Sequence, residues 1–335
     1  MQVDDVSSVG NGLIFAGFNQ DQVTTVEGLG DRGISQVEML FRCHYVALVG
    51  GGRNPAFPRH RVVIWDHVKG GALCELDFDR DVRTVRLRRD RIVVALEHSM
   101  HVYTFVEKPL HLATWDTAPN PYGLCCLCPS SDRCLLAYPA CRADGGGVVS
   151  VVDLAKTDAP SVDIEAHDGQ LACLVMNLDG SRIASASDKG TLIRVFDTSD
   201  GSKVCEVRRG AQNARIFCLN FSHDSSLLCA SSDHGTVHIF SLEDADRNKQ
   251  FSKRLSQSGG GRLLPKFLQS QWSFSRFQLP HLGKAALVGP CVCAFGHDDR
   301  SVVVVCADGG YYKYRFDEKG HCERLVYSLF LELGQ

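Results

Sequence analysis

The strongest constraint on the fold is an internal repeat in the middle of the chain. Residues 171–191 align without a gap on residues 216–236, so that Gly190 corresponds to Gly235 and the offset is 45 residues. In both copies, apolar and polar residues alternate on either side of a short turn. Alternation with a period of two predicts half-buried antiparallel strands rather than helices. A repeat of about 40–45 residues with about four strands in each unit is typical of the blades of a WD-type β-propeller.

Fainter copies of the same unit fill the remainder of the chain. Counted together with a short N-terminal stretch at 13–19, they make seven units, and helix signals are nearly absent. The sequence therefore predicts an all-β protein, a seven-bladed β-propeller of the WD40 type that occupies residues 1–335 as one domain. Too little chain lies between residues 22 and 33 for two more strands, so the first blade is expected to be incomplete. The strands predicted after the first unit include 37–40, 45–49, 62–66, 82–87, 91–96, 100–104, 125–128, 134–138, 148–153, 182–187, 191–197, 203–209, 291–295, 301–306 and 311–316.

The composition is that of an ordinary globular protein. Hydrophobic residues make up 44%, charged residues make up 22%, and the net charge is −3. Global charge thus gives no argument for nucleic-acid binding, and any basic site must be local. The first residues lack the basic and apolar segments of a signal peptide, and no apolar run is long enough to span a membrane. We therefore expect a cytoplasmic protein.

The 15 cysteines are predicted to lie mainly in the strand core. Most occur inside apolar runs, where a free thiol behaves as a small buried hydrophobe. A zinc site is the alternative, because Cys125, Cys126 and Cys128 contain a C-x-x-C spacing, with Cys134 and Cys141 downstream. Neither a second C-x-x-C nor a paired histidine motif accompanies this group, so no metal is expected.

Residues 242–269 form a long basic and apolar insertion in the sixth blade. Six basic residues and no acidic residue lie between residues 247 and 266. Basic side chains can meet anionic headgroups while apolar side chains enter the membrane interface, which favours a membrane-facing loop. The alternative is a solvated loop whose leucines pack back on the blade. The apolar residues assigned to the membrane are Phe251, Leu255, Leu263, Leu264 and Phe267.

Two adjacent arginines end the strand predicted at 203–209. Neighbouring residues on a strand point to opposite faces, so Arg208 and Arg209 are predicted to serve two sites rather than one. Two adjacent cations at a strand end are not expected to serve packing. The alternative is a solvated edge that discourages pairing with another sheet.

These features together resemble the PROPPINs, seven-bladed phosphoinositide-binding propellers, and within them the WIPI branch. The resemblance rests on Arg208-Arg209-Gly210, on the turns S-A-S-D-K-G-T and S-S-D-H-G-T, and on the basic insertion. The segments F-N-Q-D-Q (18–22), A-L-V-G-G-G (47–52) and 220–240 are similar to the third and fourth WIPI paralogues. Two departures occur: Val207 replaces the phenylalanine or leucine of the family signature, and relatives carry an additional strand pair in the first unit.

The resemblance implies two headgroup sites on the propeller rim, one on either side of the arginine pair. The first site would use His167, Ser187, Lys189, Gly190, Thr191, Arg194 and Arg208. The second site would use Arg209, Ser232, His234, Gly235, Thr236 and His238, with Arg254 or a neighbour from the insertion. The chemistry agrees, because guanidinium forks, hydroxyls and exposed turn amides are the donors that phosphate recognition requires.

Several of these residues have a purely structural alternative. The serine and threonine hydroxyls also supply turn hydrogen bonds in any WD-type hairpin. His167 lies where WD repeats often keep a histidine for an internal hydrogen-bond network. His234 stands where the first site has Lys189. The second site is therefore predicted to be weaker near neutral pH and to strengthen on acidification.

The resemblance also implies a function in autophagy. The protein would bind phosphatidylinositol 3-phosphate and 3,5-bisphosphate, attach peripherally to phagophore and endosomal membranes, and recruit the autophagy lipid-transfer protein through Asn19 and Asp21. We expect a monomer. Neither catalytic residues nor cofactors are expected, because no phosphate loop or nucleophile with an assembled base is present. Nucleic acid is not expected, since no aromatic platform accompanies the basic loop. The alternative is a WD-repeat interaction scaffold without lipid dependence.

Overall fold

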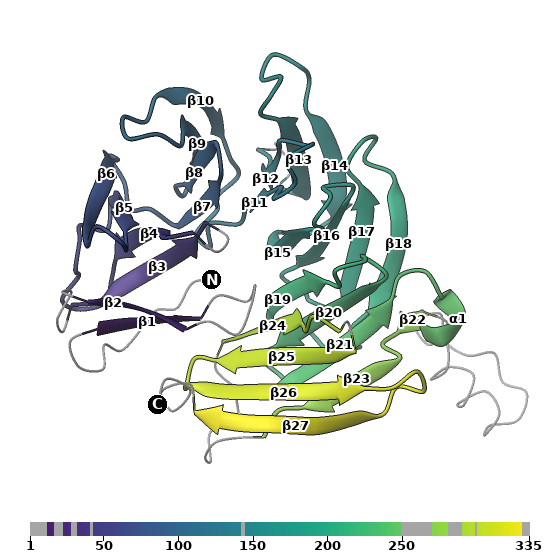
Figure 1. The fold of residues 1–335 in the computed structure, drawn as a ribbon. Coiled ribbons are helices and arrows are strands. Elements are labelled where there is room, and N and C mark those ends of the chain that lie inside the picture. Colours follow the sequence, from purple (N-terminus) through teal and green to yellow (C-terminus); the bar gives the residue numbers. More distant parts are fainter. Residues whose placement is uncertain are drawn as a thin grey trace, which may run out of the picture. The chain divides into compact units, whose positions relative to one another are not determined.

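The computed structural model of the 335-residue chain describes residues 12–16, 23–27, 32–40, 43–141, 145–248, 270–280, 290–298 and 300–329. Within these ranges almost all regular structure is β-strand, with one short helix, α1 (Ala245–Asn248) (Figure 1). None of the helical residues described belongs to a segment long and apolar enough to cross a membrane. The predicted all-β class is confirmed.

The chain divides into two compact units, the first made of 1–129, 134–143 and 152–161 and the second of 130–133, 144–151 and 162–335. The first unit holds the two-stranded sheet β1–β2 and two four-stranded sheets, β3–β6 and β7–β10, each in sequence order. Their strands are β1 (Gly12–Ala16), β2 (Val23–Glu27), β3 (Ile34–Met39), β4 (Tyr45–Gly50), β5 (Arg61–Asp66), β6 (Gly71–Asp77), β7 (Thr84–Arg88), β8 (Arg91–Ala95), β9 (Ser99–Thr104) and β10 (His111–Asp116). The residues of the next sheet, which are divided between the units, form β11 (Cys126–Leu127), β12 (Leu135–Pro139), β13 (Gly147–Asp153) and β14 (Val162–His167).

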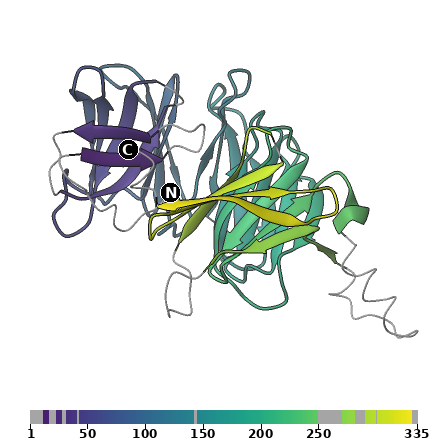
Figure 2. The ribbon, with the colours of Figure 1, turned by 60° about the horizontal axis from the view of Figure 1, so that its bottom comes forward.

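The second unit holds three further sheets, shown from teal to yellow in Figure 2. Their orders are β15-β16-β17-β18-β22, β19-β20-β21-β23 and β24-β25-β26-β27. The strands are β15 (Leu171–Met176), β16 (Arg182–Ser187), β17 (Leu192–Asp197), β18 (Lys203–Arg208), β19 (Ile216–Phe221), β20 (Leu227–Ser232), β21 (Thr236–Ser241), β22 (Gln271–Trp272), β23 (Ser275–Gln278), β24 (Cys291–Phe295), β25 (Ser301–Cys306), β26 (Gly310–Phe316) and β27 (Cys322–Leu329).

Burial explains which strands the sequence pattern could locate. The middle strands of each sheet are covered on both faces, so β20 is buried along its whole length. The outermost strand is largely exposed, as β27 is, and its apolar signal is weak. The predicted strands 182–187, 191–197 and 203–209 match β16, β17 and β18 to within one residue. The outer strands β6, β10, β14 and β27 were not located by the pattern.

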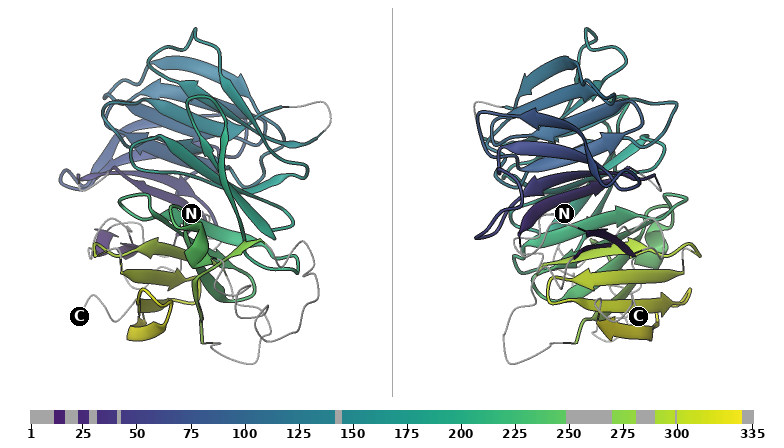
Figure 3. Two further views of the ribbon diagram at one scale, coloured as in Figure 1. Left: turned by 90° about the vertical axis from the view of Figure 1, so that its right-hand side faces the viewer. Right: turned by 60° about the vertical axis from the view of Figure 1, so that its left-hand side comes forward.

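The strands of the second unit are drawn as ribbons from two further sides in Figure 3. Apolar clusters join its successive sheets. Val207 and Ile193 pack with Leu219 between the fifth and sixth sheets, counted from β1–β2. Between the sixth and seventh sheets, Cys229 and Cys293 belong to the corresponding cluster. The prediction that most cysteines lie in the strand core is confirmed, and in the first unit Cys125, Cys126, Cys128 and Cys134 are also buried.

Two irregularities of the sequence have counterparts in the structure. The described residues of the first repeat form only the pair β1–β2, in agreement with a blade that has too little chain for four strands. The insertion leaves β21 through α1 and returns through β22, which joins the fifth sheet, before β23 completes the sixth. Residues 249–269 lie outside the described residues, and with them Arg254 and the five apolar residues assigned to the membrane. Asn19 and Asp21 lie outside them as well.

Candidate functional site

The two repeated turns have the same backbone geometry. The amide of Gly190 donates to the Ser187 carbonyl at 2.9 Å, and the amide of Gly235 donates to the Ser232 carbonyl at 2.9 Å. Both glycines adopt positive φ, 56° and 68° respectively, as expected where a tight turn between strands ends in a left-handed residue. A Cβ at Gly190 would lie 1.8 Å from the carbonyl oxygen of Ala214, so only glycine fits at this position. Each turn thus presents its central residue, Lys189 or His234, to solvent.

The adjacent arginines lie on opposite faces of the fifth sheet. Arg208 pairs with Leu192, and two residues earlier Glu206 pairs with Arg194, so Arg208, Glu206 and Arg194 share one face. Val207 belongs to the other face, where it packs in the cluster between the fifth and sixth sheets. Arg209 reaches the same side as Val207 and contacts the turn of the sixth sheet. The predicted separation of the two arginines is confirmed.

Arg208 keeps most of its hydrogen-bonding capacity for a ligand. Its Nε donates to Ser270 Oγ at 3.0 Å. Among the described residues, its two terminal nitrogens have no hydrogen-bond partner. The side chain is half-buried. A guanidinium held in this way presents a planar fork of donors, which is the geometry that phosphate oxygens accept.

Arg194, in contrast, makes hydrogen bonds within the protein. Its Nε donates to Glu206 Oε2 at 2.8 Å, and its Nη1 donates to the Ala166 carbonyl at 2.7 Å. Lys203 adds a second cation 3.7 Å from the same Glu206 oxygen. Arg194 therefore links β14 to β18, and the carboxylate of Glu206 compensates its charge.

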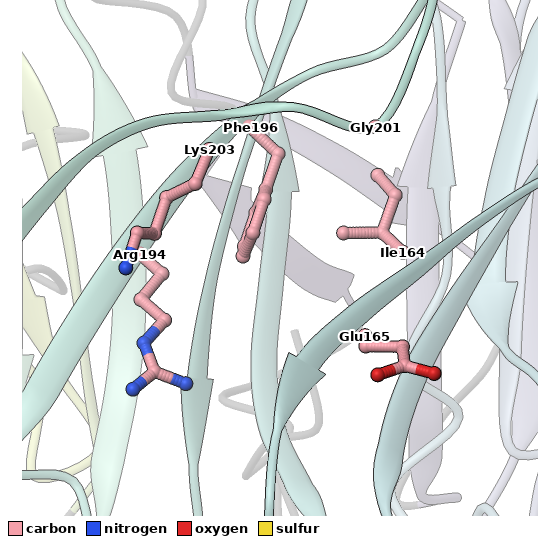
Figure 4. A pocket seen from close by; sticks show the side chains of 6 residues that line it. All are labelled: Ile164, Glu165, Arg194, Phe196, Gly201 and Lys203. Atoms are coloured by element: carbon pink, nitrogen blue, oxygen red, sulfur yellow. The ribbon is translucent and has the colours of Figure 1, made fainter.

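A shallow hollow of about 360 Å³ lies beside this ion pair (Figure 4). It is lined by Ile164, Glu165, Arg194, Phe196, Gly201 and Lys203. Lys203 begins β18 and Arg208 ends it, so the hollow and the arginine fork lie toward opposite ends of one strand. Of the residues predicted for the first headgroup site, Arg194 alone is among those that line the hollow.

His167 is a buried, neutral member of the first face. Its Nε2 lies 3.0 Å from Ser185 Oγ. Burial and the nearby Arg194 guanidinium lower the pKa of His167 to about 4, so the ring is uncharged at neutral pH. Ser187 is also buried, whereas Lys189 is exposed. The first face thus offers the half-buried Arg208, and the turn between β16 and β17 carries the exposed Lys189.

Arg209 contacts both turns and the segment that follows β18. Its Nε donates to the Gly190 carbonyl at 2.9 Å, its Nη2 donates to the Gln212 carbonyl, and its Nη1 lies 3.4 Å from His234 Nδ1. Only 5% of the residue is exposed. Burial lowers the pKa of Arg209, against the opposing effect of Asp233, although a guanidinium remains charged at neutral pH.

The second face contains a buried histidine and an unused hydroxyl. His238 Nδ1 lies 3.0 Å from Ser273 Oγ, and burial, together with the charges of Arg209 and Arg276, lowers the pKa of His238 to about 3. Ser232 Oγ is buried without a hydrogen-bond partner in the described part of the chain. A buried polar group without a partner is costly, and such groups are often completed by a ligand or water.

Thr236 is engaged at the edge of the same face. Its Oγ1 donates to Gln278 Oε1 at 2.6 Å, and Gln278 Nε2 in turn donates to the His234 carbonyl at 2.9 Å. The structure therefore gathers the described residues of the two predicted sites around two turns. It also adds three residues that sequence reasoning missed, Ser270, Ser273 and Gln278. No local motif marks them, because they follow an insertion of unpredictable path.

Comparison with known proteins places the chain among its relatives. The PROPPIN family model matches residues 11–261. The chain is 36% identical over 326 residues to SVP1-like protein 2 of Emericella nidulans, with 88% of this chain and 100% of that protein covered. It is 34% identical over 319 residues to autophagy-related protein 18 of Dictyostelium discoideum, with coverage of 90% and 83%. The crystal structure of Hsv2 from Kluyvelomyces marxianus is similar with a TM-score of 0.69 and 26% identity, covering 92% and 88% of the two chains. The predicted seven-bladed propeller class is confirmed by these likenesses.

Proposed function

The chain belongs to the PROPPIN family, and from this premise and the two arginine environments we propose that it is a non-enzymatic phosphoinositide effector in autophagy. It binds phosphatidylinositol 3-phosphate and 3,5-bisphosphate through one site on each side of Arg208-Arg209. Relatives of similar length include autophagy-related protein 18 of Dictyostelium discoideum, which supports the assignment to autophagy.

A single observation carries this proposal. Arg208 is fixed through Nε, while its two terminal nitrogens have no hydrogen-bond partner among the described residues. The exposed Lys189 supplies a second cation from the preceding turn. A doubly charged phosphate accepts a bidentate fork and a point charge, and both are offered here without an acidic competitor in hydrogen-bond contact with Arg208.

The second site is proposed around Arg209, Ser232, His234 and His238. The buried Ser232 hydroxyl, without a partner in the described chain, is available to a phosphate oxygen. Two sites of modest affinity on one molecule bind a membrane far more tightly than either alone, because the second contact is intramolecular. The insertion at 242–269, through Arg254 and its apolar residues, is proposed to add membrane contacts.

Liposome co-sedimentation tests the lipid dependence. Wild type should sediment with vesicles containing either phosphoinositide and should remain in solution with phosphatidylcholine vesicles. Arg208→Ala/Arg209→Ala should abolish sedimentation while circular dichroism still reports a folded protein. Arg315→Ala removes an exposed arginine of β26 and is the matched control for lost surface charge. Sedimentation that ignores the lipid or the double substitution would favour the WD-repeat interaction scaffold.

Recruitment of the autophagy lipid-transfer protein is proposed to depend on Asn19 and Asp21. Asn19→Ala/Asp21→Ala should lose binding of that partner while vesicle binding stays at the wild-type level. We also propose that the protein attaches to phagophore and endosomal membranes as a monomer from the cytoplasm. Loss of lipid binding in the same variant would show that these positions act on the fold rather than on the partner.

A further inference from the structure

The insertion returns to a sheet other than the one it leaves. It starts from β21 in the sixth sheet, yet β22 pairs in parallel with β18 of the fifth. In this register Val207 lies opposite Gln271, and Arg208 lies opposite Trp272. Residues directly opposite each other on neighbouring strands share a face. Trp272 is therefore the immediate neighbour of Arg208 on the face of the first site.

A buried amide fastens both ends of the insertion. Asn248, of which 1% is exposed, accepts from the Ser241 amide at 3.0 Å and donates to the Ser241 carbonyl at 2.5 Å. Its Nδ2 also lies 3.2 Å from Gln271 Oε1 on the returning strand. Beside this network, the Arg247 guanidinium stacks 3.7 Å from the Phe274 ring centre. These contacts hold the two ends of the insertion together.

The returning strand also holds the arginine of the first site. Ser270 Oγ accepts the hydrogen bond from Arg208 Nε at 3.0 Å. This bond orients the guanidinium, and in the described part of the chain both terminal nitrogens remain without a hydrogen-bond partner. An arginine that is already ordered loses less rotamer freedom when it binds, which raises affinity without any new contact.

We propose that Ser270 is a positioning residue for Arg208, and that strand β22 makes the stem of the insertion part of the first anion site. This inference rests on the proposed function. An anion at Arg208 and the pairing of β22 with β18 then stabilise each other, because coupling between two equilibria is reciprocal. The stem serves the first site, although sequence and resemblance assigned the insertion to the second through Arg254.

Trp272 provides a reporter at the pairing itself. The chain contains three tryptophans, so Trp65→Phe/Trp115→Phe leaves Trp272 as the only one. Titration with inositol 1,3-bisphosphate, a soluble headgroup, should change the Trp272 emission with the same midpoint as the heat of binding. Ser270→Ala should weaken this binding about three- to tenfold, as expected for one hydrogen bond, and Ser270→Thr should restore it. Ser202→Ala, which removes an exposed hydroxyl before the opposite end of β18, should leave the Trp272 midpoint unchanged.

The outcomes separate this inference from the proposal on which it rests. If wild type gives no heat with the headgroup and does not sediment with phosphoinositide vesicles, the proposed function itself fails. If the headgroup binds but Trp272 emission stays constant and Ser270→Ala binds like wild type, only the positioning role is overturned. Hydrogen exchange on the wild type provides a check that does not depend on a variant folding. The headgroup should slow exchange in the peptide covering residues 270–274, and unchanged exchange there would contradict the coupling.

Discussion

The two faces of the fifth sheet receive adjacent arginines and use them differently. Arg208 is half-buried and, among the described residues, makes one hydrogen bond, to Ser270. Arg209 is buried and donates to the carbonyl of Gly190 in the first turn and to that of Gln212 after β18. We therefore expect removal of Arg208 to have little effect on the fold and removal of Arg209 to destabilise it. The dipeptide combines a cation proposed to face a ligand with a cation that holds neighbouring backbone in place.

The largest effect is expected from Gly190, whose carbonyl links the first turn to Arg209. Gly190→Ala places a Cβ 1.8 Å from the Ala214 carbonyl oxygen and forces alanine to a φ of 56°. We expect the free energy of unfolding to fall by about 2–4 kcal/mol, from left-handed strain and overpacking together. Both headgroup sites should weaken at once. Urea denaturation and vesicle binding measure the two effects.

Gly210→Ala is the matched control, because it follows the arginine pair directly. A Cβ at Gly210 meets no atom within 4 Å. This substitution should change the unfolding free energy by no more than about 0.5 kcal/mol. Equal destabilisation by the two substitutions would show that the region tolerates no alanine, for a reason other than the turn geometry.

The single arginine substitutions test the comparison directly. Arg209→Ala leaves the Gly190 and Gln212 carbonyls without their donor and should cost about 2 kcal/mol of unfolding free energy. Arg208→Ala should leave stability within about 0.5 kcal/mol of wild type and yet lose binding at the first site. Urea denaturation together with two-site calorimetry measures both. Equal stability of the two variants would refute the structural role of Arg209.

The buried histidines of the two faces should make the stability of the fold depend on pH over different ranges. Below about pH 6.5 the unfolded chain protonates both histidines, while the native protein keeps His167 neutral to about pH 4 and His238 to about pH 3. The unfolded state then binds more protons than the native state, so stability falls as the pH falls. The contribution of His238 extends to a lower pH than that of His167. His238→Gln should reduce the loss between pH 6.5 and 5 by about 1.5 kcal/mol. Urea denaturation across this range measures it, and an unchanged slope would show that His238 is not held neutral.

Much of the fold could be predicted from the sequence because apolar and polar residues alternate along each strand of the repeat. Strands such as β16 and β24 are covered on both sides and match the predicted ranges closely. The opposite faces of Arg208 and Arg209 followed from strand geometry alone. Outer strands such as β10 are partly exposed and polar, so alternation could not locate them.

The candidate site was only partly accessible to the same reasoning. The turn residues repeat at a fixed offset, so their common geometry could be predicted. Arg194 donates hydrogen bonds to Glu206 and to a backbone carbonyl of β14. These contacts depend on packing between sheets, which no local sequence pattern encodes. Ser270 meets Arg208 only because a long insertion returns to another sheet, and a two-residue strand such as β22 leaves no periodic signal.

The smallest effect is expected at the central residues of the turns, where Lys189 and His234 occupy equivalent positions and both are exposed. A lysine carries a full charge at pH 7.5, whereas a histidine generally does not. His234→Lys should therefore strengthen the second site about threefold at pH 7.5, the size expected for one exposed charge. The measurement is calorimetry in an Arg208→Ala background, which leaves the second site alone. Equal binding by the lysine variant and by the protein with His234 in place would contradict a contribution of this position and leave Arg208 and Arg209 as the source of any asymmetry between the sites.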